Sequence, residues 1–229
     1  MKELSSSQFV GITAIISAAL YILSIIGLQY YISSDLNQVP AFAQNMVDNH
    51  SMMLIYGWPG FIATILILPL VFYIYLKNAK SFYGRNVLTV TLIGLSFIMI
   101  AYLFHLALTY FYAPSLLTMD ENSKEVTSYI FRNLIGLQDM FWLGGDLLAF
   151  MGIALLTAAN KRNLKFPGWL VGFGILACIL ASLGSFSFIP AFKKVPGLSF
   201  LFIGGFALFT IWEIIIGIYL LKKKQSVQA

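Results

Sequence analysis

The chain has 229 residues, of which 59% are hydrophobic and 10% are charged. Soluble domains carry about 25% charged residues, so this composition excludes an ordinary soluble globular protein. The net charge of +5 comes mainly from short basic tracts beside apolar segments, which indicates membrane topology rather than nucleic-acid binding. The single cysteine, Cys178, excludes an intramolecular disulfide and a multi-cysteine metal site.

Six apolar segments are each long enough to cross a hydrocarbon core of about 30 Å. They lack the alternation of barrel strands, and backbone groups in lipid must be satisfied internally, so these segments are expected to be helices. We therefore predict an all-α transmembrane helix bundle, with residues 1–229 forming a single membrane domain. The expected spans are 9–31, 52–76, 87–112, 137–159, 167–189 and 198–221.

The first span could be mistaken for a signal peptide. Its apolar run is too long for the hydrophobic region of such a peptide and lacks a small-x-small cleavage site, so we expect a retained helix. Positive charge concentrates on one side of the predicted bundle, which places both termini in the cytoplasm and the protein in the plasma (inner) membrane. The basic residues of that side are Lys2, Lys77, Lys80, Arg85, Lys161, Arg162, Lys165, Lys222, Lys223 and Lys224, against Lys124, Arg132, Lys193 and Lys194 on the other.

The first outer loop has helical periodicity. Its apolar residues recur at i, i+3, i+4, i+7 and i+8, and Pro40 suits a first helical turn. They are Val39, Phe42, Ala43, Met46 and Val47. We expect a short amphipathic helix that lies on the outer surface or caps the bundle.

Proline and glycine predict local features of three spans. Pro59 and Pro69 each remove a backbone hydrogen bond, so the second span is expected to be kinked or locally unwound. Glycines in the fourth span, and the GxxxG pair Gly168 and Gly172 in the fifth, let helices approach closely. We interpret both groups as packing within the chain rather than as a dimer interface.

Charged residues recur at seven-residue intervals towards and into the fourth span. Seven residues are almost two helical turns, so these residues would share one side of a helix that extends outward to about Ser123. Trp142 lies on the same side, and Asn122 or Ser123 would cap the extension. We call the set the ionisable stripe; its members are Glu125, Arg132, Asp139 and Asp146.

Two polar layers follow from the expected depths. His105, Arg132 and Asp139 would form an outer layer, with Arg132 keeping the Asp139 carboxylate ionised. Asp146 and Glu213 would form an inner layer near the midplane, where the two acids could share a proton. Acidic residues are costly at that depth, which favours a functional role for both. For Glu125 and Arg132 we favour a solvated helical extension without a functional role, whereas His105 fits an ordinary buried hydrogen-bonding group equally well.

The sequence lacks the motifs of several enzyme classes. No nucleotide-binding glycine loop, HExxH pair or GxSxG elbow occurs. His50 and His105 are the only histidines, which excludes a zinc site of three histidines. We predict no cofactor and no metal. The alternatives left open are a site with both histidines and a carboxylate, and a bis-histidine haem.

The last span ends in WEIIIG, from Trp212 to Gly217, and is followed by lysines. With the N-terminal span and the longer outer loop, this layout resembles uncharacterised bacterial six-helix integral membrane families that contain a domain of unknown function. The resemblance implies a membrane domain and carries over no activity or site residues.

Three functions fit these features. The first is binding or transport of a small molecule or ion through an outward-facing cavity that reaches Asp146, with the candidate site Asp146, Glu213, Asp139, His105, Arg132 and Trp142. The second is a membrane-embedded enzyme acting on a lipid or isoprenoid, with a carboxyl group as general acid or base. The third is a non-catalytic accessory or sensor subunit. The expected partners are the bilayer and a small molecule or proton, without nucleic acid; a homo-oligomer is left open.

Overall fold

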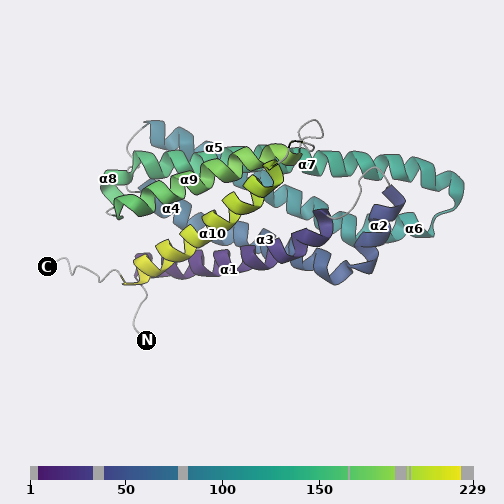
Figure 1. The fold of residues 1–229 in the computed structure, drawn as a ribbon, viewed down its shortest axis with the longest axis horizontal. Helices are drawn as coiled ribbons and strands as arrows, with labels where there is room; N and C mark the ends of the chain where they lie inside the picture. The colour runs from purple at the N-terminus through teal and green to yellow at the C-terminus, as the bar shows by residue number, and fades with distance from the viewer. Residues whose placement is uncertain are drawn as a thin grey trace.

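The computed structural model describes residues 5–32, 39–76, 82–164, 166–188, 195 and 197–222. Within these ranges the chain is almost entirely helical and contains no strand (Figure 1). Six helices are long and apolar enough to span a membrane, which confirms the predicted all-α multi-pass architecture. They cover Ser6–Leu28, His50–Leu76, Tyr83–Thr118, Ser123–Ala159, Gly168–Ser187 and Leu198–Lys222.

Several spans are built from more than one helical element. In chain order the elements are α1 (Ser6–Ile32), α2 (Val39–Asp48), α3 (His50–Leu66), α4 (Leu68–Leu76), α5 (Phe82–Ala107), the π-helix η1 (Leu108–Tyr112), α6 (Ala113–Thr118), α7 (Glu121–Ala159), α8 (Lys161–Leu164), α9 (Gly168–Gly184), the 3₁₀-helix η2 (Ser185–Phe188) and α10 (Leu198–Lys222).

The spans pack as a closed ring. Each packs against its neighbours in the chain, from α1 to α3, α5, α7, α9 and α10, and α10 packs back against α1. The start of α1 and the end of α10 lie at the same end of the bundle, which we call the terminal end (Figure 1). Helices α2 and α6 lie at the opposite, distal end. The cytoplasmic placement of the termini stays a prediction.

Close packing between α5 and α7 depends on glycine. A Cβ at Gly94 would collide with the backbone nitrogen of Ala149, and one at Gly145 would collide with Ile98. Overpacking of this kind costs about 1–3 kcal/mol. The glycines of the fourth span therefore pack within the chain, as the sequence predicted.

The same prediction is wrong for the GxxxG pair of α9. A Cβ on Gly168 or Gly172 would meet no atom within 4 Å, and both residues are exposed. Their side of α9 also carries the exposed Trp169 and Leu176. The prediction was wrong because a GxxxG pattern shows only that another helix could approach this face closely. It does not show whether a helix of the same chain packs there.

The second span is interrupted near one of its two prolines. Helix α3 continues through Pro59, and the chain leaves the α-helix at Ile67 before α4 begins at Leu68. Pro69 is therefore in the first turn of α4, where its missing N–H costs least. The predicted interruption is confirmed at Pro69, whereas Pro59 is accommodated within a helix.

The amphipathic helix of the first outer loop is confirmed as α2. Its apolar residues Val39, Phe42, Ala43 and Met46 are buried against α6 and α7, with the Phe42 and Phe131 rings 6.1 Å apart. Helix α2 therefore caps the distal end of the bundle.

Helix α7 extends beyond the predicted fourth span towards the distal end, which confirms the predicted helical extension. Its 39 residues correspond to about 58 Å, well beyond a hydrocarbon core of about 30 Å. The predicted cap was wrong: Asp120 is the N-cap, and its side chain accepts a hydrogen bond from the backbone nitrogen of Ser123 at 2.9 Å. The helix begins earlier than the spacing suggested because the carboxylate of Asp120 satisfies this first-turn N–H.

Candidate functional site

The ionisable stripe runs from solvent into the centre of the ring. Glu125 and Arg132 are exposed, Asp139 is half-buried and Asp146 is completely buried. Trp142, between the last two, is also buried. Burial increases along the stripe because its residues share one side of α7, and α7 passes from its projecting distal part into the bundle.

Asp146 is held by the end of the fifth span. The Ser185 hydroxyl donates to its Oδ2 at 3.3 Å, and among the described residues its Oδ1 has no hydrogen-bond partner. Asp146 lies thirteen residues from the end of α7 at Ala159, or about 20 Å along the helix. The carboxyl group is therefore inside the apolar layer and partly unsatisfied.

Glu213 is held by a different helix. The Ser17 hydroxyl lies 3.0 Å from its Oε1 and 3.1 Å from the carbonyl oxygen of Ala63, so one hydrogen serves two acceptors. Within the described part of the chain, the Oε2 atom of Glu213 has no hydrogen-bond partner. Like Asp146, Glu213 is completely buried with one carboxyl oxygen unsatisfied.

The two central acids do not form the single layer that the sequence suggested. Phe150, one turn from Asp146, packs against Phe209, one turn from Glu213, with ring centroids 4.9 Å apart. Along the bundle axis, Asp146 lies about 6 Å from Phe150 and Glu213 lies about 6 Å from Phe209, in opposite directions. The two acids are therefore separated by about 12 Å along the bundle. Direct sharing of a proton requires hydrogen-bonding distance, which this arrangement does not provide.

The expected outer layer is also divided. His105 is buried, with its Nε2 atom 3.0 Å from the carbonyl oxygen of Met53 and its ring against Tyr56. Arg132 is exposed, and its seven-residue separation from Asp139 is about 10.5 Å along α7, too long for the expected ion pair. Lys124 and Glu121, near the start of α7, form an ion pair at 3.9 Å.

A row of hydroxyl groups on α1, missed by the sequence analysis, crosses the same core. Ser17, Tyr21 and Ser24 follow one another at helical spacing on one face. Besides the Ser17 contact with Glu213, the Tyr21 hydroxyl lies 3.1 Å from Thr64 Oγ1, and Ser24 donates to the carbonyl oxygen of Tyr56 at 2.7 Å. Interhelical hydrogen bonds of this kind fix neighbouring helices in register. The i, i+4, i+7 spacing of these residues was visible in the sequence.

A pocket opens between α1 and α10. The two helices touch near the terminal end, where a Cβ on Gly11 would meet the carbonyl oxygen of Gly217, and they diverge towards the distal end (Figure 1). The pocket occupies about 360 Å³, including space open to its surroundings. Nine side chains line it: Ser24, Ile25, Leu28, Tyr56, Tyr102, Trp142, Phe202, Ile203 and Phe206.

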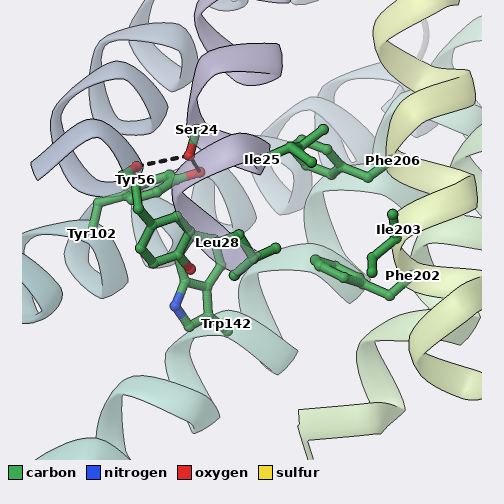
Figure 2. A pocket seen from close by; sticks show the side chains of 9 residues that line it. All are labelled: Ser24, Ile25, Leu28, Tyr56, Tyr102, Trp142, Phe202, Ile203 and Phe206. Carbon is green, nitrogen blue, oxygen red and sulfur yellow. Dashed lines mark hydrogen bonds between the residues drawn. The ribbon is translucent and has the colours of Figure 1, made fainter. Parts of the chain in front are cut away.

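The lining has two parts. Figure 2 shows Ser24, Tyr56, Tyr102 and Trp142 on one side of the pocket and the α10 residues Phe202, Ile203 and Phe206 on the other. The Ser24 hydroxyl lies 3.3 Å from the Tyr102 hydroxyl, so this first side has polar as well as aromatic character. Of the expected site residues Trp142 lines the pocket, whereas Asp146 and Glu213 do not. The pocket is thus apolar and lateral, unlike the aqueous cavity reaching Asp146 that we expected.

Comparison with known proteins assigns the chain to a family. The family model described as a domain of unknown function (DUF4386) matches residues 9–223. The chain belongs to this family. The match confirms the resemblance inferred from the layout, and it covers all six spans except the first three residues of span one. No curated protein and no solved structure matches the chain.

The described residues contain no group of three histidine, cysteine, aspartate or glutamate side chains close enough to hold a metal ion. Asp146 and Glu213 are instead each paired with one serine. A further buried polar residue, Gln138, was overlooked beside the conspicuous Asp139. Its amide is completely buried, and neither its nitrogen nor its oxygen has a hydrogen-bond partner among the described residues.

Proposed function

We propose that this DUF4386 protein binds a membrane-soluble small molecule in the pocket between α1 and α10. The observation that carries the proposal is the lining: apolar and aromatic walls that end at hydroxyl-bearing side chains. Small-molecule sites are concave and mostly apolar, with a few polar groups that orient the ligand. The lining of the α1–α10 pocket has this character.

Access from the bilayer follows from the position of the pocket. It lies on the seam where the last span closes the ring onto the first, and Ile203 on that seam is 38% exposed. A ligand that partitions into lipid could enter between α1 and α10 without crossing water. We propose that the distal end faces outward and that both termini are cytoplasmic, because the basic residues are more numerous at the terminal end.

The two buried acids support a second element of the proposal. Asp146 and Glu213 each retain one unsatisfied carboxyl oxygen in the core, which suits proton or cation binding coupled to occupancy of the neighbouring pocket. An enzyme acting on a lipid is the weaker alternative, because a general acid or base must reach the reacting atom and neither acid lines the pocket. An accessory subunit would instead tolerate Asp146→Asn and Glu213→Gln without any change in ligand occupancy.

The test uses a pair of matched variants on α10. Ile203→Trp fills the pocket, whereas Ile211→Trp places the same side chain on a surface position that is 47% exposed and outside the pocket lining. Native mass spectrometry of protein purified in mild detergent should show a bound small molecule in the wild type and in Ile211→Trp, and strongly reduced occupancy in Ile203→Trp. Equal occupancy in both variants, or an unoccupied wild type, would contradict the proposal.

A further inference from the structure

The contacts between α5 and α7 define an antiparallel register. Each step of three or four residues forward along α5 is matched by a step of three or four residues backward along α7. The facing pairs are Thr91 with Gly152, Gly94 with Ala149, Ile98 with Gly145 and Tyr102 with Trp142. The next step along this interface reaches His105 on α5 and Gln138 on α7.

The register therefore places Gln138 opposite His105. Consecutive helical residues are rotated by about 100°, so the neighbouring Asp139 points to a different side of α7, consistent with its partial exposure. Thr109, one turn beyond His105, is also buried, and its Oγ1 lies 3.5 Å from His105 Nε2. We call His105, Thr109 and Gln138 the distal polar cluster, because the register places them at one level, although no hydrogen bond joins Gln138 to the other two.

The backbone beside this cluster is irregular. Thr109 belongs to the π-helix η1, which interrupts the third span three residues after His105. Single π-turns inside α-helices cost stability and occur frequently at functional sites. The irregular turn and the unpartnered amide of Gln138 are independent observations, and both occur at the same level of the bundle.

The distal polar cluster adjoins the α1–α10 pocket. Trp142 and Tyr102 line the pocket and lie one turn from Gln138 and His105, respectively. Tyr56, also in the lining, has its ring centroid 4.6 Å from that of His105. The cluster is thus separated from the pocket by about one helical turn and by the aromatic side chains that close this end of it.

We propose that Gln138 recognises the polar head of the ligand whose apolar part occupies the α1–α10 pocket, and that this head is a neutral hydroxyl group. This inference rests on the proposed function. A primary amide donates and accepts, so Gln138 can satisfy both the oxygen and the hydrogen of an alcohol. The head reaches the amide when the rings of Tyr56 and Trp142 turn aside, a side-chain adjustment of the kind that binding commonly produces.

Charge excludes the commoner lipid heads at this position. A buried phosphate or carboxylate requires a cationic partner, and the nearest cation on α7, Arg132, is exposed and about 9 Å farther out along the helix. An ammonium head would require an anion on the same side of α7, whereas the neighbouring Asp139 points to a different side and Asp146 lies about 12 Å from Gln138 in the opposite direction. The cluster itself consists of an amide, an imidazole and a hydroxyl, which suit an uncharged alcohol.

The test compares three probes that share one chain. Radiolabelled farnesol, its methyl ether and farnesyl phosphate are titrated against the full-length protein in phosphatidylcholine nanodiscs. Wild type is expected to bind farnesol most tightly, because the ether loses the donor and the phosphate adds an unpaired charge. Gln138→Leu should weaken farnesol binding by about five- to tenfold, the loss of one or two hydrogen bonds, and weaken ether binding less, because the ether oxygen can only accept from the amide. Ile203→Trp should weaken binding of all three probes, whereas Ile211→Trp should weaken none.

The outcomes separate the two proposals. Equal binding of farnesol to wild type and Gln138→Leu, with loss in Ile203→Trp, would overturn the assignment of Gln138 and leave the pocket intact. Preference for the ether or the phosphate over farnesol would overturn the neutral-alcohol assignment in the same way. Absence of binding by any probe, or equal binding in Ile203→Trp and Ile211→Trp, would overturn both proposals. Gln138→Asn keeps the amide and is expected to retain the preference for alcohol over ether.

Discussion

Gln138→Leu should stabilise the unliganded protein. The amide of Gln138 is completely buried, and neither of its polar atoms has a partner among the described residues. Burying an amide without a hydrogen bond costs about 1–3 kcal/mol, and leucine occupies a similar volume without that cost. Allowing for imperfect repacking around a branched side chain, we expect a gain of about 1–2 kcal/mol in the free energy of unfolding.

Thermal unfolding followed by tryptophan fluorescence in detergent measures this gain. For a chain of this length, about 1 kcal/mol corresponds to about 2–4 °C, so the Tm of Gln138→Leu should rise by about 3–6 °C. Ser24→Ala is the matched control, because the Ser24 hydroxyl donates to the carbonyl oxygen of Tyr56 at 2.7 Å. Its removal should cost about 1 kcal/mol and lower the Tm.

A fall in the Tm of Gln138→Leu comparable to that of Ser24→Ala would refute this reasoning. It would mean that the Gln138 amide is a structural hydrogen-bonding group like the serine. A rise in Tm together with weaker farnesol binding would instead show a residue that is kept for binding at a cost to stability.

Three further predictions concern packing, the central acids and orientation. Gly94→Val should destabilise the protein by more than about 2 kcal/mol, because the valine side chain meets the α7 backbone. Gly172→Val, at an open position, should change the Tm little. Equal effects of the two variants on the Tm would contradict the α5–α7 packing. Glu213→Gln preserves an acceptor for the Ser17 hydroxyl and should lower the free energy of unfolding by less than about 1 kcal/mol. Glu213→Ala should lower it by about 2–4 kcal/mol, as measured by thermal unfolding. Similar losses in the two variants would contradict the contact between Ser17 and Glu213. Tyr129→Cys, in a Cys178→Ser background, should react with a membrane-impermeant thiol reagent in intact cells, because residue 129 is exposed on the distal part of α7. Labelling only after lysis would contradict the proposed orientation.

The six spans could be predicted because their boundaries depend on one strong physical requirement. A helix in lipid needs a long apolar run, and that run is visible without any knowledge of packing. The amphipathic face of α2 and the outward extension of α7 were predicted for a related reason, since helical periodicity alone shows which side is apolar or charged. Each of these features depends on residues near one another in the chain.

The arrangement of the site depends on contacts between helices, which periodicity does not specify. Asp146 and Glu213 were expected to meet because both lie near the middle of their spans, yet Phe150 and Phe209 pack between their levels. Gln138 escaped notice because an amide beside Asp139 is inconspicuous in a sequence. Its importance depends on the α5–α7 register, which the glycine contacts establish in three dimensions.

Photo-crosslinking tests the central claim, ligand binding between α1 and α10, most directly. A diazirine analogue of farnesol is irradiated with the protein in nanodiscs, and the modified peptides are identified by mass spectrometry. We expect crosslinks concentrated on Leu28 of α1 and on Phe202, Ile203 and Phe206 of α10, and their suppression by excess farnesol. Crosslinks spread evenly over exposed positions such as Leu176 and Leu183 of α9, insensitive to competitor, would contradict the account.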